Sequence, residues 1–200
     1  MKKPRSDPHS KAIKRTEVTH GIYHIIAGHQ ADAGRAIAYL GGRPIHVATA
    51  TSVETAVAAT TAALDLRKQK LRNQRQDDVP SVAEFQEALN ALDPRTFATI
   101  APLLRIHRHL PRQAASIADL ARVSGLEESA ALALYLKLGK AMASTLEIVP
   151  EGNGLARRIL PLLVFATIEP GEGRKILLQL RPTFVDALDE CAGPLRRTAA

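Results

Sequence analysis

The spacing of apolar residues changes along the chain, from alternation near the N-terminus to helical periodicity in the remainder. Between residues 18 and 47, β-branched and aromatic residues alternate with glycine-containing turns, which is typical of a small antiparallel sheet. We expect three strands there, at residues 22–26, 36–40 and 45–47. Ser52 then caps a long helix over residues 53–76. The apolar stripe expected on that helix consists of Val53, Val57, Leu64 and Leu71. The pattern therefore predicts a β-β-β-α domain over residues 18–78.

Helical spacing resumes after the break at Asp77-Asp78-Val79-Pro80, which we expect to separate two domains. Ser81 and Glu84 have the spacing of a capping box, in which each side chain bonds the backbone amide of the other residue. A helix is expected to follow as far as Asp93-Pro94, and a second helix over residues 95–109. These two helices would support the segment that comes next.

Residues 116–138 predict two helices joined at a glycine. Ser116 and Asp119 stand three residues apart at the head of an apolar pattern, where a hydroxyl and a carboxylate can cap the first free amides of a helix. Gly125 interrupts the pattern, and glycine enters the left-handed backbone of a tight turn without steric cost. Leu126 is expected to return to the core. The buried stripe expected on the second helix consists of Ala131, Leu134 and Leu138.

The C-terminal part of the chain predicts a β-hairpin and a last helix. Two β-rich segments, residues 162–168 and 175–180, flank a glycine-rich turn at residues 169–174. A short helix over residues 182–191 is expected to close at Gly193-Pro194. The predicted fold is therefore α+β throughout.

The two-helix segment resembles the helix-turn-helix family, in which a small residue lets two helices cross closely and a glycine makes the turn. The residues that carry this resemblance are Ala121, Gly125, Leu126, Ala131 and Leu134. With the hairpin after it, the segment resembles a winged helix, and the stretch A-A-L-A-L-Y-L-K-L-G-K resembles a helix of uncharacterised bacterial winged-helix proteins. The N-terminal unit is similar, in its order of elements, to the small N-terminal domain of HicB-type antitoxins. The resemblance implies a winged helix-turn-helix domain over residues 79–193, with a tail over residues 194–200.

Composition narrows the class of protein. The 200 residues are 46% apolar and carry a formal net charge of +7, which fits one or two globular domains and contact with a polyanion. Residues 1–17 are rich in cations and poor in apolar side chains, so we expect a flexible basic arm that either solubilises the chain or contacts phosphates. The single Cys191 excludes an intrachain disulfide and is typical of a reducing, cytoplasmic location. The longest apolar run, residues 159–168, is too short to span a bilayer, so we expect no membrane anchor.

Candidate catalytic and metal chemistry is sparse. A zinc site built from His20, His24 and His46 is one interpretation of the seven histidines, but no carboxylate falls at a ligand spacing and ordinary surface or core histidines are favoured. The glycine pairs lack the lysine and the following helix of a phosphate-binding loop. No nucleophile with a base and an orienting acid is evident. We therefore expect neither an enzyme nor a protein with a metal or other cofactor.

Cations near the two-helix segment suggest DNA as the partner. The candidate nucleic-acid-binding residues are Arg112, Arg122, Ser129, Lys137, Lys140, Arg157, Arg158, Arg174 and Lys175. The first turn of the second helix offers Glu127 and Glu128 and no arginine, lysine, asparagine or glutamine for base reading, so contacts to phosphates are favoured. The predicted function is a DNA-binding regulator of double-stranded DNA, with a homodimer through exposed Leu132 and Leu136 as one form. The alternative is a non-catalytic adaptor that uses the same fold for protein contact.

A further basic run ends the first long helix. It consists of Arg67, Lys68, Lys70, Arg72 and Arg75. Cations at a helix C-terminus favour the helix dipole, so a solvated basic face is the favoured interpretation and a nucleic-acid contact is the alternative.

Overall fold

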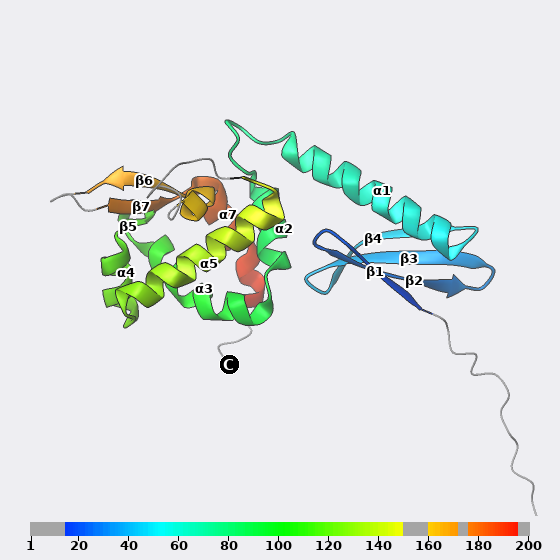
Figure 1. The fold of residues 1–200 in the computed structure, drawn as a ribbon, viewed down its shortest axis with the longest axis horizontal. Helices are drawn as coiled ribbons and strands as arrows, with labels where there is room; N and C mark the ends of the chain where they lie inside the picture. Colours follow the sequence, from blue (N-terminus) through cyan, green and yellow to red (C-terminus); the bar gives the residue numbers. More distant parts are fainter. Residues whose placement is uncertain (1–14, 150–159, 172–175, 196–200) are drawn as a thin grey trace, which may run out of the picture. The chain divides into compact units, whose positions relative to one another are not determined.

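The computed structural model describes residues 15–149, 160–171 and 176–195. Contacts divide the chain into two compact units, residues 1–66 and 67–200, which are described separately (Figure 1). The fold is α+β, with a four-stranded antiparallel sheet followed by helices and a second, smaller sheet.

The first unit contains one more strand than expected. Its strands are β1 (Thr16–His20), β2 (Tyr23–Gln30), β3 (Ala33–Leu40) and β4 (Arg43–Ala50), paired antiparallel in the order β1-β2-β3-β4. The prediction of three strands was wrong because the polar run that forms β1 has a single large apolar residue, Val18, and is recruited by pairing with β2. The expected basic arm therefore ends before Thr16, and residues 1–14 lie outside the described part of the chain.

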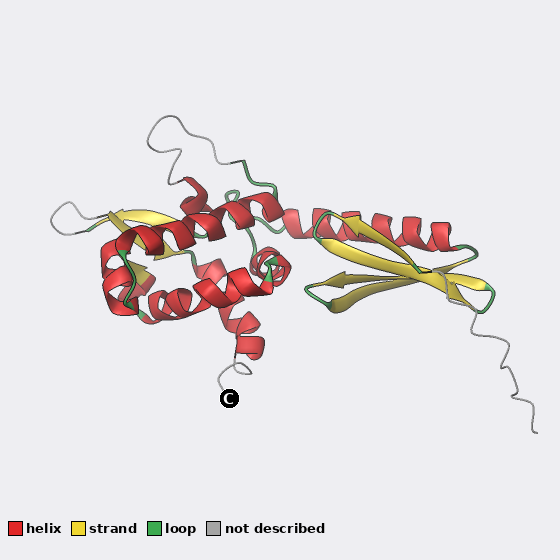
Figure 2. Ribbon diagram, turned by 60° about the horizontal axis from the view of Figure 1, so that its bottom comes forward, coloured by secondary structure: helices red, strands yellow, loops and turns green. Residues whose placement is uncertain are grey.

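Helix α1 (Val53–Arg72) covers one face of this sheet (Figure 2). It ends before residue 76, the predicted end, because the chain turns at Asn73. Its buried residues are Val53, Ala56, Thr60 and Leu64. Val57 and Leu71 of the expected stripe are only half-buried. The sheet contributes small and apolar side chains from alternate positions, namely Tyr23, Ile25, Ala27, Ala36, Ala38 and Leu40. Among the described residues of the unit, no element covers the other face of the sheet.

The second unit consists of helices with a three-stranded sheet. The helices are α2 (Val82–Ala91), α3 (Pro94–His109), α4 (Ile117–Ser124), α5 (Glu128–Leu146) and α7 (Pro182–Leu195), with the short 3-10 turns η1 (Pro111–Gln113) and η2 (Leu160–Val164). The strands are β5 (Ala114–Ala115), β6 (Ala166–Pro170) and β7 (Ile176–Leu180), in the order β5-β7-β6. The predicted hairpin is confirmed as β6 and β7.

Local signals located the helix starts well. The capping box at Ser81 and Glu84 is present in both directions, Ser116 caps α4, and Gly125 has the left-handed backbone (φ 69°).

Three expectations at the ends of elements were wrong. Leu126 does not return to the core and is 38% exposed, because it follows the left-handed residue at the outer corner of the turn. The β-rich segment begins with η2, so β6 starts only at Ala166. Helix α7 continues through Gly193-Pro194, since one missing amide near a helix end does not by itself terminate the helix.

Aromatic side chains form the centre of the second core. The rings of Phe85 and Phe165 each lie 5.2 Å from that of Phe184, and the Tyr135 ring lies 5.7 Å from Phe165. All four side chains are fully buried. They come from α2, α5, α7 and the segment between η2 and β6, so the cluster ties segments far apart in sequence into one core.

Candidate functional site

The α4–α5 pair is set by short-range hydrogen bonds. The Ser116 hydroxyl accepts the Asp119 amide at 3.1 Å and donates to the Asp119 carboxylate at 2.7 Å. At the other end of α4, the amides of Gly125 and Leu126 bond the carbonyl of Ala121. These bonds satisfy backbone groups that a helix end leaves free, and so they define the turn into α5.

A buried histidine joins three elements around this pair. The Nε2 atom of His107 in α3 lies 2.9 Å from the Leu178 carbonyl in β7, and Nδ1 lies 2.8 Å from the Tyr135 hydroxyl in α5. A carbonyl can only accept, so Nε2 carries the proton and the Tyr135 hydroxyl donates to Nδ1. Burial lowers the pKa of His107 to about 4 and raises the pKa of the Tyr135 hydroxyl. The imidazole is therefore neutral, and it links α3, α5 and β7.

Helix α5 also packs closely against η2. A Cβ atom added at Gly139 would lie 2.2 Å from the carbonyl oxygen of Pro161, so only glycine permits this approach of α5 to η2. The Arg181 guanidinium donates twice to the Leu163 carbonyl, at 3.1 and 3.0 Å, and so joins η2 to the end of β7. Together with the His107 link, these contacts hold α5 and the hairpin in one body.

Of the predicted DNA contacts, two arginines each lie beside an acid. The Arg112 side chain is 78% exposed and its guanidinium lies 3.6 Å from the Glu169 carboxylate. The Arg122 side chain is 74% exposed and lies 3.1 Å from the Asp119 carboxylate. The Arg112 backbone has φ 56°, and its carbonyl accepts the Gln179 amide at 3.1 Å. Arg112 therefore lies at the hairpin and Arg122 on α4.

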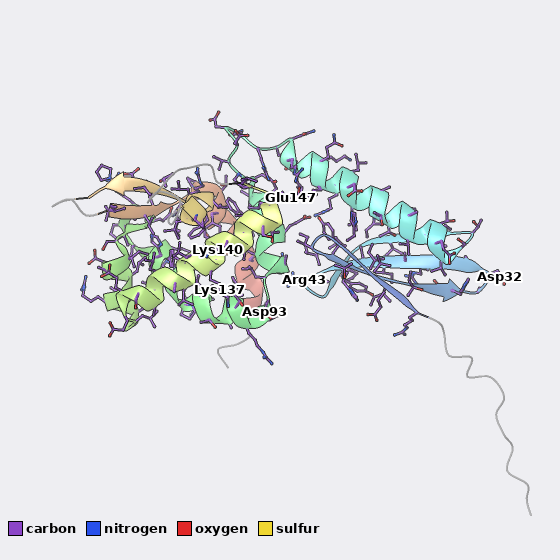
Figure 3. All side chains as sticks on the ribbon, viewed as in Figure 1. Asp32, Arg43, Asp93, Lys137, Lys140 and Glu147 are labelled. Atoms are coloured by element: carbon purple, nitrogen blue, oxygen red, sulfur yellow. The ribbon has the colours of Figure 1, made fainter. Side chains whose placement is uncertain are left out.

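Three more candidates, Ser129, Lys137 and Lys140, are exposed on α5. Lys137 lies at the middle of the helix and Lys140 in its C-terminal half (Figure 3). At 1.5 Å per residue, Ser129 and Lys140 are separated by about 16 Å along the axis, so the three do not form one cluster. The remaining candidates, Arg157, Arg158, Arg174 and Lys175, lie outside the described residues.

The exposed face of α5 differs from the expected one. Leu132 and Leu136 are not exposed; they are half-buried and pack against the core. The reason is that α4 and η2 pack on α5 in addition to α2 and α3, which leaves a narrow exposed stripe. Glu127 and Glu128 are exposed as expected. The two leucines therefore offer less apolar surface to a second subunit than the sequence pattern indicated.

The basic run at the end of α1 is largely neutralised within the second unit. Arg67 pairs with Glu87, and Arg75 pairs with Glu84 at 2.7 Å. Lys68 and Arg72 both contact Glu147, whose carboxyl pKa they lower. Glu147 is distant in sequence from both of its partners. Most of the run is therefore ion-paired, in place of the solvated basic face that the sequence favoured, because packing brings acids from α2 and the end of α5 to it.

The histidines of the first unit do not converge on a metal. In the antiparallel register, His20 lies opposite Tyr23, on the side of α1, and His24 lies one position further, on the opposite face. His20 lies 2.7 Å from Asp65 of α1, and His24 lies 3.7 Å from Glu17. Among the described residues, no group of three or more metal-ligating side chains is found. The three-histidine site considered from the sequence is therefore not formed.

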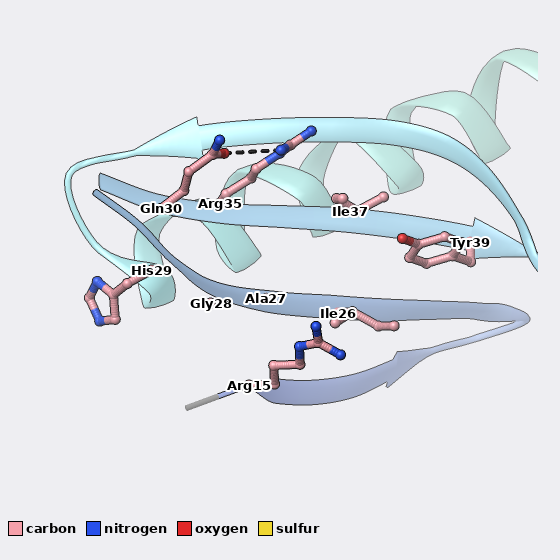
Figure 4. A pocket seen from close by; sticks show the side chains of 9 residues that line it. All are labelled: Arg15, Ile26, Ala27, Gly28, His29, Gln30, Arg35, Ile37 and Tyr39. Carbon is pink, nitrogen blue, oxygen red and sulfur yellow. Dashed lines mark hydrogen bonds between the residues drawn. The ribbon is translucent and has the colours of Figure 1, made fainter. Parts of the chain in front are cut away.

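A hollow of about 300 Å³ lies on the open face of the first sheet. Its walls include Arg15, Ile26, Arg35, Ile37 and Tyr39 (Figure 4). Sequence reasoning did not select these residues. The alternation of residues along β3 could have indicated them. Residues 34, 36, 38 and 40 are buried, so residues 35, 37 and 39 must point to the opposite face of the sheet.

Within the described parts of the chain, no helix has both the length and the apolar content required to cross a membrane. No match to the chain was found among protein-family models, curated proteins or solved structures.

Proposed function

We propose that the second unit is a winged helix-turn-helix that binds double-stranded DNA, mainly through its phosphates, and that the protein acts as a regulator. The observation that carries the proposal is the pairing of β5 with β7. Because β5 leads directly into α4, backbone hydrogen bonds fix the β6–β7 hairpin beside the α4–α5 pair. A hairpin held rigidly next to two crossed helices is the arrangement in which a duplex can be contacted by both.

The charges available for such contact lie around the hairpin and the helix pair. Arg112 is exposed next to β6 and β7, and Arg122 is exposed on α4. Arg174 and Lys175 belong to the connection between β6 and β7 in the sequence. Contacts from these cations to phosphates would fix orientation without reading bases in detail. This supports a DNA-binding mode of modest sequence selectivity.

Titration of labelled duplex DNA with the full chain, over a series of salt concentrations, tests the proposal. We expect affinity that falls steeply with salt, because each phosphate contact releases condensed counterions. The double variant Arg174→Glu and Lys175→Glu should weaken duplex binding at least about tenfold and reduce the salt slope by about two. The matched control is Arg43→Glu, a charge reversal in the first unit, which should leave duplex affinity within about twofold.

A second candidate function is that of a non-catalytic adaptor that contacts another protein through the same fold. The observation that favours it is the acidic start of α5, where Glu127 and Glu128 are exposed and would repel phosphates. Absence of duplex binding even at low salt, with the fold intact by circular dichroism, would favour this second function over the first.

A further inference from the structure

The sheet of the first unit has two chemically different faces. Helix α1 covers the face formed by Ile25, Ala38 and their neighbours. On the other face, the register places Ile26 opposite Ile37 and Ile37 opposite Val47, which forms an apolar row across three strands. The adjacent rows contain His24 opposite Tyr39 and Gly28 opposite Arg35. The Tyr39 ring therefore lies in the row on one side of the apolar row, and the Arg35 guanidinium lies in the row on the other side.

The hollow on this face combines an apolar floor with a cationic rim. Ile26 and Ile37 are half-buried in its floor, and Tyr39 of β3 lies beyond Ile37 (Figure 4). Arg15 and Arg35 line the same hollow, and Arg35 is oriented by a 3.0 Å hydrogen bond to the Gln30 side chain. Gly28, opposite Arg35, leaves room above the strand because it has no side chain. The site can therefore receive a flat apolar group and a neighbouring anion together.

The charge of this face is positive on balance, because Arg15 and Arg35 outnumber the carboxylate on its strands, Glu17, which lies opposite Ile26. Among the described residues, neither Arg15 nor Arg35 has an acid within ion-pair distance, and the carboxylate of the face, Glu17, lies 3.7 Å from His24. The chain that leads into Arg15 adds cations in the sequence at Lys2, Lys3, Arg5, Lys11 and Lys14, against a single acid at position 7. A polyanion is the partner that this charge pattern complements.

We propose that the open face of the first sheet binds single-stranded nucleic acid. Unpaired bases would lie on Ile26, Ile37 and the Tyr39 ring, and phosphates would contact Arg15 and Arg35. Bases stack on aromatic side chains regardless of sequence, and cations along a groove follow the backbone. A duplex suits the hollow poorly, because its bases are stacked inside and its backbone would meet the apolar floor. The site is independent of the proposed duplex-binding function of the second unit.

A second copy of the chain fits this face less well. Among the large apolar residues described in the first unit, Val47 is the one on this face that is clearly exposed, at 48%. A face with one clearly exposed large apolar residue offers little of the apolar surface that a stable interface buries. Two such faces packed together would also bring the arginines of one copy near those of the other. Charge and area therefore both favour the polyanion.

The experiment is fluorescence anisotropy of labelled 12-nucleotide oligothymidylate and oligouridylate, titrated with the full chain at low salt. Tyr39→Ala should weaken binding at least about fivefold, since loss of one base-stacking ring has effects of that order or larger. Tyr39→Phe keeps the ring and should remain within about twofold. Arg35→Glu should weaken binding about tenfold at low salt and less at high salt. Arg43→Glu is the charge control, because Arg43 pairs with Leu40, whose side chain faces α1.

The outcomes separate this site from the other proposals. The variant Arg174→Glu with Lys175→Glu should leave single-strand affinity unchanged while it affects duplex binding. Unchanged single-strand affinity in both Arg35→Glu and Tyr39→Ala would overturn the proposal, as would equal competition by duplex DNA. A dimer in sedimentation that dissociates on Val47→Arg, without any oligonucleotide binding, would assign the face to a second copy. If Tyr39→Ala unfolds the unit, Arg15→Glu at an exposed position and Arg35→Glu at a half-buried one decide the question.

Discussion

The two units differ in how their cations are paired. In the second unit, several basic residues lie beside carboxylates supplied by other elements, as Lys68 and Arg72 do beside Glu147. In the described part of the first unit, Arg15, Arg35 and Arg43 have no acid within ion-pair distance. The net charge of +7 is therefore a poor guide to where a polyanion would bind. The ion pairs of the folded protein decide which cations can contact a polyanion. A count of charges in the sequence does not show these pairs.

The units also differ in how completely they enclose their cores. The second unit surrounds an aromatic cluster from several sides, whereas the described residues of the first unit bury one sheet face and leave the other open. Each unit nevertheless contains one close backbone approach that only glycine allows, at Gly34 in the first and Gly139 in the second. If the two units are independent, a substitution that destabilises one unit should leave the stability of the other unchanged.

The largest effect is expected from alanine at these two glycines. A Cβ atom at Gly139 would lie 2.2 Å from the Pro161 carbonyl oxygen, and one at Gly34 would lie 2.1 Å from the Ser52 carbonyl oxygen. Because backbone cannot move aside as a side chain can, each substitution should reduce the free energy of unfolding by about 3 kcal/mol or more. Hydrogen exchange should show faster opening of β2 and β3 for Gly34→Ala and of α5 for Gly139→Ala. Opening of both units by either variant would contradict their independence.

The next effect is a pH dependence of the second unit that His107 causes. His107 has a pKa of about 4 in the folded protein and an ordinary value of about 6.5 when unfolded, so the unfolded chain binds the proton more tightly. The stability of the unit should be complete above about pH 6.5 and should fall as the pH is lowered toward 4, by up to about 3 kcal/mol.

Denaturant titrations at several pH values, followed by hydrogen exchange at α3 and α5, measure this dependence. His107→Gln removes the titrating group while its side-chain amide can still donate to the Leu178 carbonyl. The slope between pH 4 and 6.5 should therefore be smaller in this variant. An identical slope in the variant would show that other groups cause the dependence.

A smaller effect is expected at the start of α4. Ser116→Ala removes the hydroxyl that accepts the Asp119 amide, and loss of such a cap costs about 1 kcal/mol of unfolding free energy. The matched control is Ser129→Ala, because Ser129 is exposed in the first turn of α5 and caps no helix. Chemical denaturation should show a change for the first variant and almost none for the second. Equal changes would mean that the Ser116 cap does not stabilise the α4–α5 pair.

The smallest effect is expected from Glu147→Gln. The carboxylate is half-exposed, so its pairs with Lys68 and Arg72 should contribute less than about 0.5 kcal/mol to stability. Removing it should instead leave two cations without their acid and tighten duplex binding at low salt by no more than about threefold. Thermal unfolding and the duplex titration measure the two quantities. A large loss of stability would contradict this prediction and mean that these pairs hold the second unit together.

Much of the second unit could be predicted because its signals are short-range. The capping box at Ser81, the cap at Ser116 and the left-handed turn at Gly125 each depend on residues within a few positions of one another. The exposed state of Leu126 was missed because helical spacing does not indicate on which side of a corner a residue lies. Strand β5 was missed for a related reason, since two alanines carry no strand signal until β7 pairs with them.

The candidate sites were less predictable than the helices. Arg112 and Arg122 were selected for their charge, but their acidic neighbours Glu169 and Asp119 were not considered. The hollow around Arg35 and Tyr39 was not selected at all, because its members come from several strands whose register is a property of the folded sheet.

By itself, the sequence determined the α+β class, the starts of the helices and the glycine turn, because caps and turns are satisfied by neighbouring backbone groups. Only the tertiary structure decided that His107 is buried and neutral, that the basic end of α1 is paired with acids, and that one sheet face stays open. These properties depend on contacts between residues far apart in the chain. Their partners are brought together by packing, which no local pattern of residues records.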